Sequence, residues 1–83
     1  MKNTNTISAR KLAIFSSNVA RSRKLSGMTK TEFASNTTVS RDTIRRIETR
    51  PEGYVPSAST IEAIANLVGA SPKEILGTRL KFA

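Results

Sequence analysis

Residues 28–49 read MTKTEFASNTTVSRDTIRRIET and carry the start signals of two short helices. The first signal is the capping box 29–32 (TKTE), in which the Thr hydroxyl and the Glu carboxylate each accept a hydrogen bond from the other residue's backbone N–H. Met28 and Phe33 flank this box at the positions of a hydrophobic staple. The pattern predicts a helix that begins at Thr29 and stays short, because the polar run 35–38 favours local side-chain bonding.

A second helix is predicted to begin at Ser40. Serine is a favoured N-cap residue, Val39 can pack on Ile44, and Asp42 lies in the first turn, where the helix dipole favours a carboxylate. A helical wheel places Thr43, Ile44 and Ile47 on one side. The other side is polar or charged and consists of Arg41, Asp42, Arg45, Arg46 and Thr49.

The order of these two helices predicts a function. Two short helices joined by residues 36–39, the second with a polar outer face, are typical of a helix-turn-helix, which places its second helix in the major groove of DNA. Arginine suits that groove because its guanidinium bonds bidentately to N7 and O6 of guanine, and each such pair discriminates between bases by about 1–3 kcal/mol.

Further helices are predicted on both sides of this pair. Before it, Leu12, Phe15 and Val19 recur at helical spacing, and Ser26-Gly27 ends that helix. After it, two prolines and a glycine make residues 51–56 a loop. A fourth helix begins at Ser57 or Ser59, with the apolar residues Ile61, Ile64, Ala65 and Val68, and ends at Gly69; a fifth extends from Ser71-Pro72 to Gly77.

The sequence therefore predicts an all-α domain of five helices over residues 9–77. A flexible arm is expected before it, at residues 1–8, and a tail after it, at residues 78–83. The apolar residues near the end, Leu76, Leu80 and Phe82, are predicted to lie either in the core or at a dimer contact.

The charge of the chain is concentrated in its first half. The 83 residues include 14 Lys or Arg and 6 Asp or Glu, a net charge of +8, and residues 10–50 account for +7 of it. Such a concentration favours a face held against a polyanion over a merely solvated basic surface.

Several classes of function are disfavoured. The chain has no Cys and no His, which excludes disulfides, zinc fingers and imidazole bases. Its longest apolar run is the four residues 12–15, so a cytoplasmic, nucleoid-associated protein with no membrane partner is expected. The few carboxylates lie mostly at helix starts and no glycine-rich phosphate loop is present, so neither an enzyme nor a cofactor or metal site is predicted.

The chain resembles the Cro/lambdoid phage repressor family of helix-turn-helix proteins, of the xenobiotic-response-element type, from about residue 18 to residue 76. The similar motifs are MTKTEFA (28–34), VSRDTIRRIE (39–48), IEAIA (61–65) and GASPKEIL (69–76). Three positions depart from the family pattern: Thr38 stands where Gly is usual in the turn, Lys30 where Gln is common, and Arg50-Pro51 where a Gly commonly follows the recognition helix.

The resemblance implies roles for individual residues. Arg41, Asp42, Arg45 and Arg46 match positions that read base edges or adjacent phosphates. Phosphate-contacting or positioning roles fall to Thr29, Lys30, Ser40, Thr49 and Arg50, and weaker candidates are Lys2, Arg10 and Lys11. Arg23 and Glu48 match a pair that ties the first helix to the third.

Structural alternatives exist for three side chains, Asp42, Arg46 and Tyr54. Asp42 and Arg46 are i, i+4 neighbours and could form a simple surface ion pair. Tyr54, in the predicted loop, could anchor that loop on the core or donate a hydrogen bond to a phosphate.

The function expected from the residues and the resemblance together is sequence-specific binding of double-stranded DNA. We expect a transcriptional repressor of phage or bacterial origin that binds a palindromic operator as a homodimer. The alternative is an antitoxin of the same fold, which would autoregulate its operon and also bind a protein toxin.

Overall fold

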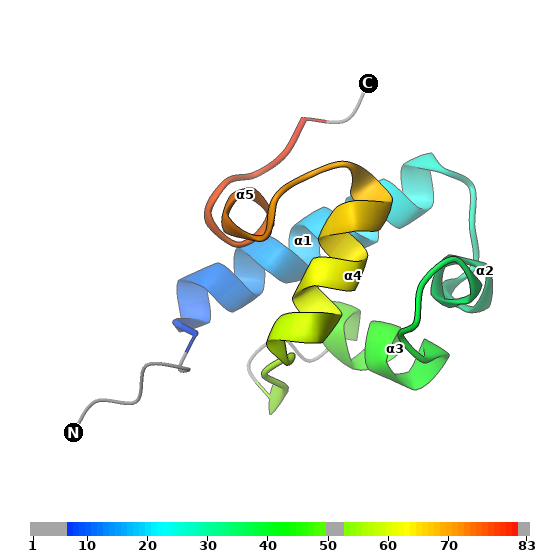
Figure 1. Cartoon of the computed structure of the whole chain (residues 1–83), viewed down its shortest axis with the longest axis horizontal. Helices are drawn as coiled ribbons and strands as arrows, with labels where there is room; N and C mark the ends of the chain where they lie inside the picture. Colours follow the sequence, from blue (N-terminus) through cyan, green and yellow to red (C-terminus); the bar gives the residue numbers. More distant parts are fainter. Residues whose placement is uncertain (1–6, 50–52, 82–83) are drawn as a thin grey trace.

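The computed structural model describes residues 7–49 and 53–81, and these residues form an all-α bundle of five helices with no strand (Figure 1). This confirms the predicted fold class. The helices are α1 (Ala9–Leu25), α2 (Lys30–Ser35), α3 (Arg41–Thr49), α4 (Ala58–Val68) and α5 (Pro72–Gly77).

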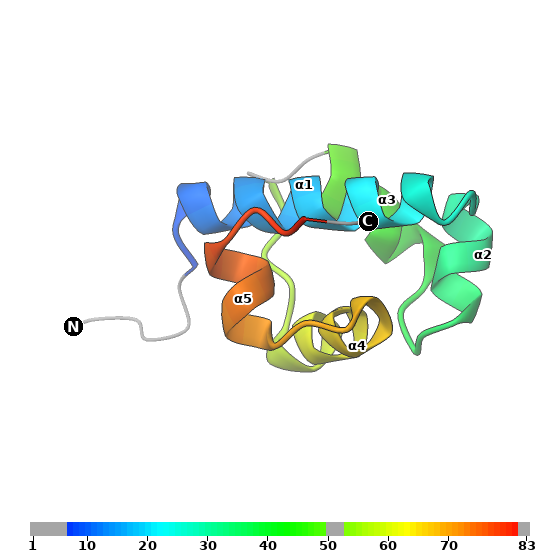
Figure 2. The ribbon, with the colours of Figure 1, turned by 90° about the horizontal axis from the view of Figure 1, so that it is seen from above.

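Helix α1 is the longest element and packs against both α3 and α5. The Ser8 hydroxyl caps its start by accepting from the Lys11 N–H at 3.2 Å, and Gly27 follows its end with a φ of 71°, in the left-handed region that favours glycine. Figures 1 and 2 place α5 and the start of α1 at one end of the long axis and α2 at the other. Helix α3 packs on both α1 and α2.

The core is formed by apolar side chains from all five helices. Phe15 and Val19 of α1 meet Phe33 of α2 and Ile44 of α3, and every one of these is at most 2% exposed. Helices α4 and α5 contribute Ile61, Ile64, Ala65 and Ile75. Burial of each large apolar side chain contributes about 1.5–3 kcal/mol, so this core is what positions the helices.

The helix starts follow the capping signals in the sequence. Reciprocal capping boxes are present at α2 (Thr29 with Glu32) and at α5 (Ser71 with Glu74). Of the two candidate caps of α4, Ser57 is the one used, because its hydroxyl accepts from the Thr60 N–H at 3.2 Å. Ser59 instead lies inside the helix.

Residues 78–81, here called the C-terminal strap, run back along α1 (Figure 2). Leu76 and Leu80 are half-buried and pack against the core. Phe82, for which the same two interpretations were open, lies outside the described residues, as do residues 1–6 of the predicted arm.

Candidate nucleic-acid interface

Helix α3 has one buried and one exposed face. Ile44 and Ile47 are 0% and 2% exposed and fix the helix on the core. Arg45 and Arg46 lie on the opposite side and are exposed, as the helical wheel predicts. Neither of these two guanidinium groups forms an ion pair within residues 7–49 and 53–81. The exposed face of α3 therefore presents positive charge that the described part of the protein does not neutralise.

At the start of α3, Asp42 contacts Arg41 rather than Arg46. The closest approach is 3.9 Å between Asp42 Oδ1 and an Arg41 Nη atom, and the two side chains are 59% and 65% exposed. An exposed pair at this separation contributes little to stability. Both side chains can exchange this contact for one with a ligand. The surface ion pair between Asp42 and Arg46, which the i, i+4 spacing allows, is absent from the described residues.

Helix α2 packs on α3, and its start is fixed by the capping box. The Thr29 N–H donates to Glu32 Oε1 at 2.8 Å, and the Glu32 N–H donates to Thr29 Oγ1 at 3.1 Å. Thr29 is exposed and Lys30 is half-buried. Both residues predicted to position the domain on phosphates thus belong to a locally rigid turn.

The turn between α2 and α3 is built from side-chain hydrogen bonds. Thr37 Oγ1 donates to the Ala34 carbonyl at 3.0 Å and accepts from the Val39 N–H at 2.8 Å. No residue of the described chain other than glycine has a positive φ, so Thr38 avoids the left-handed conformation that the usual glycine would adopt. The departure from the family pattern at this position is therefore accommodated by a different backbone path.

Arg23 joins α1 to α3 and to the loop that precedes α2. Its Nε and Nη atoms donate to the two carboxylate oxygens of Glu48 at 2.7 and 2.9 Å, and a third N–H donates to the Met28 carbonyl at 3.0 Å. The side chains of Arg23 and Glu48 are 12% and 6% exposed. The hydrogen bond that Arg23 donates to Glu48 raises the pKa of Arg23, against the effect of desolvation. This pair, which the resemblance implied, fixes the angle between α1 and α3.

The other predicted contact residues lie at the ends of helices. The Ser40 hydroxyl accepts from the Thr43 N–H at 3.2 Å and so caps α3, whereas the Thr49 hydroxyl donates to the Arg45 carbonyl at 2.7 Å in the last turn. Both are exposed. Arg10 and Lys11 are exposed at the start of α1, and Lys2 and Arg50 lie outside the described residues.

Two polar residues of α1 were not singled out from the sequence. Asn18 is fully buried: its Nδ2 donates to the carbonyls of Ile75 and Thr78 at 3.0 and 2.9 Å, and its Oδ1 accepts from the Leu80 N–H at 2.9 Å. Ser16 donates from Oγ to the Glu48 carbonyl at 3.3 Å. The position of Asn18 could have indicated its role. Residues 15, 18, 19 and 22 share one face of the predicted helix, and a polar side chain on an apolar, buried face needs a hydrogen-bond partner.

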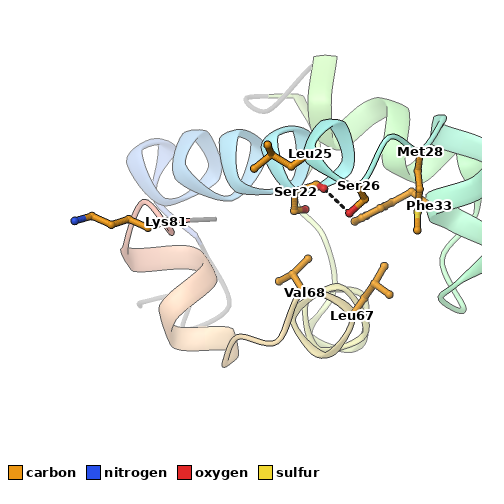
Figure 3. A pocket seen from close by; sticks show the side chains of 8 residues that line it. All are labelled: Ser22, Leu25, Ser26, Met28, Phe33, Leu67, Val68 and Lys81. Carbon is orange, nitrogen blue, oxygen red and sulfur yellow. Dashed lines mark hydrogen bonds between the residues drawn. The ribbon is translucent and has the colours of Figure 1, made fainter. Parts of the chain in front are cut away.

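Tyr54 is half-buried and packs against the core cluster, which agrees with the role of a loop anchor. A pocket of about 440 Å³ lies elsewhere, where the end of α1 faces the end of α4 (Figure 3). Its walls mix apolar side chains, Leu25, Phe33 and Val68 among them, with polar ones such as Ser22. None of the predicted contact residues lines it, so it is separate from the exposed face of α3.

Residues 7–49 and 53–81 contain neither a membrane-spanning helix nor a cluster of metal-binding side chains. No helix there is long and apolar enough to cross a membrane. No group of three or more acidic, His or Cys side chains is placed to hold a metal ion in the same residues.

Comparison with known proteins assigns the chain to a family. Residues 15–76 match the family model described as a helix-turn-helix domain, and this range includes α2, the turn and α3. The chain belongs to this helix-turn-helix family. Domains of this class bind DNA with the second helix of the motif, which here is α3. No match was found among curated proteins or among solved structures.

Proposed function

We propose that this helix-turn-helix domain binds double-stranded DNA in a sequence-specific manner, with α3 in the major groove. The supporting observation is the two-sided nature of α3: Ile44 and Ile47 anchor it, while Arg45 and Arg46 are exposed and free of ion pairs within the described residues. Arg41 and Asp42 share the same exposed surface. Arginine in this position recognises guanine, and a carboxylate can accept from N4 of cytosine.

Residues at the edges of the motif would set the register of the domain on the duplex. Five residues would contact phosphates in this way. They are Thr29 and Lys30 at the start of α2, Ser40 at the start of α3, and Thr49 and the following Arg50. Such contacts fix orientation and carry no direct sequence information.

We further propose that the protein is a transcriptional repressor of phage or bacterial type that acts near the nucleoid in the cytoplasm. Two copies would bind a palindromic operator whose half-sites lie about one helical turn, roughly 34 Å, apart. A bound dimer of this kind would obstruct transcription by occupying the duplex.

Selection of duplexes from a random pool, followed by footprinting, tests the proposal. A single enriched palindrome that binds two copies of the chain is expected. Replacement of Arg45 or Arg46 by Ala should relax preference at one base pair in each half-site, a loss of about 1–3 kcal/mol in discrimination. Lys73→Ala removes the same charge from exposed α5 and is the matched control.

Two results would contradict these assignments. Uniform weakening on every duplex, with preference intact, would mean that the arginines contact only phosphates. Independent binding of single copies to separated half-sites would exclude the dimer.

A further inference from the structure

A second surface with arginines lies between the strap and the start of α1. It is a groove of about 480 Å³ lined by Arg10, Ala13, Ile14, Gly77, Thr78 and Arg79, and it is called the strap groove below. One arginine comes from α1 and the other from the strap. The floor includes the half-buried Ile14, so the groove combines apolar and cationic surface.

The strap wall of this groove is held by hydrogen bonds to the side chain of Asn18, which is itself fully buried. Asn18 accepts from the Leu80 N–H and donates to the Thr78 carbonyl, which places one bond on each side of Arg79 along the backbone. Because Asn18 is anchored in α1 and bonds to the backbone on both sides of Arg79, it holds this part of the strap against α1. The groove therefore has two walls of defined separation.

The charge of the strap groove is not neutralised from within the described chain. Arg10 and Arg79 are exposed, no carboxylate lines the groove, and neither arginine forms an ion pair with any of residues 7–49 and 53–81. Exposed guanidinium groups that flank an apolar floor match a segment in which carboxylates accompany small or apolar side chains.

We propose that the strap groove binds an acidic segment of a protein partner. Each guanidinium would take a carboxylate bidentately, and an apolar side chain of the segment would contact Ala13 and Ile14. At Gly77 a Cβ atom would meet nothing within 4 Å, so the groove is open at this point and lets a peptide backbone approach closely.

The number of cations argues against a second duplex in this groove. Proteins that hold duplex DNA by its backbone typically neutralise about 6–10 phosphates, and the lining residues supply two positive charges. Two arginines match a short segment with two carboxylates more closely than they match a continuous polyanion.

A second copy of the chain is also a poor occupant. The groove is lined by two arginines, so a second copy would have to present carboxylates to it. Among the described carboxylates, those of Glu32 and Glu74 are used in capping boxes and that of Glu48 is bound by Arg23. The described surface thus offers no pair of neighbouring free carboxylates to fill the groove.

The position of the groove allows both ligands to bind at once. Figures 1 and 2 show α5 and the start of α1 at one end of the molecule, with α3 displaced toward the other. The inference does not depend on DNA binding by α3, and it adds to the proposed function a route by which a protein could be brought to the operator.

A display library of random ten-residue peptides, selected on the immobilised full chain without DNA, tests the inference. Enriched peptides should carry two or more Asp or Glu beside apolar residues. Fluorescence anisotropy with the enriched peptides then compares variants: Arg10→Glu and Arg79→Glu should each weaken binding by about tenfold or more. Lys73→Glu and Lys24→Glu change the net charge equally at exposed positions outside the groove and should weaken it far less.

Each alternative outcome overturns the inference. Equal weakening by all four variants would mean attraction by net charge alone, and an absence of enriched acidic peptides would mean that the groove has no such ligand. Peptide binding that is lost in Arg45→Ala would place the ligand on α3 instead. Because the peptide assay contains no DNA, failure to find an operator leaves its result unaffected.

Discussion

At the scale of single residues, Glu48 shows how one carboxylate fixes the recognition helix. It receives two hydrogen bonds from Arg23 and is 6% exposed, and its backbone carbonyl accepts from Ser16. All of these contacts join α3 to α1. The orientation of the exposed face of α3 therefore depends on a residue whose side chain is directed at α1.

We expect Glu48→Gln to lower the free energy of unfolding by about 3 kcal/mol, because a mostly buried guanidinium would keep its charge and lose its counter-charge. Urea unfolding followed by circular dichroism measures this change. The control is Asp42→Asn, which removes a carboxylate from an exposed pair and should change stability by at most about 0.5 kcal/mol. Equal losses for the two variants would contradict the role assigned to Glu48.

Lys30 carries a different prediction at this scale. If it contacts a phosphate, Lys30→Ala should reduce by about one unit the slope of log affinity against log salt concentration, with base preference unchanged. Titration of the selected duplex at several salt concentrations measures the slope. A changed base preference, or a slope equal to that of Lys73→Ala, would mean that Lys30 does not contact phosphate.

The sequence predicted the exposed residues of α3 better than the contacts between distant parts of the chain. The outward arginines of α3 follow from helical period alone, since Ile44 and Ile47 define the inner face. The pairing of Arg23 with Glu48 joins positions 25 residues apart and came only from the resemblance. Asn18 has partners 57 to 62 residues away, so no local pattern could reveal them.

At the scale of helices, local signals located the starts of α2 and α5 because a capping box is complete within four residues. The start of α4 was ambiguous between Ser57 and Ser59. Both serines precede the same apolar residues, and the helical period of Ile61, Ile64 and Ala65 is the same for either start.

The two capping boxes provide a matched pair of variants. Thr29→Ala and Ser71→Ala each remove one cap and should each lower the free energy of unfolding by about 1 kcal/mol. Only Thr29→Ala should also weaken binding to the selected duplex beyond the loss explained by stability. Thermal unfolding and duplex titration of both variants measure the two effects. Equal changes in stability and in duplex affinity for the two variants would mean that Thr29 does not contact DNA.

At the scale of the whole molecule, Asn18 connects the first helix to the last residues of the described chain. We expect Asn18→Ala to lower the free energy of unfolding by about 2 kcal/mol, because three backbone groups, the buried Ile75 carbonyl among them, lose their partner. Hydrogen exchange at the Leu80 amide should accelerate. Asn66→Ala, at an exposed position of α4, is the control. Unchanged Leu80 exchange in Asn18→Ala would mean that the strap is held by other contacts.

The threonine turn between α2 and α3 also affects the chain before it folds. A glycine at position 38 would give the unfolded segment more backbone freedom to lose, whereas a β-branched residue restricts it in advance. A residue other than glycine that fits the native backbone without strain stabilises by about 0.4–1 kcal/mol through this difference. The two helices of the motif are thus joined by a linker with less backbone freedom to lose when their apolar faces first meet.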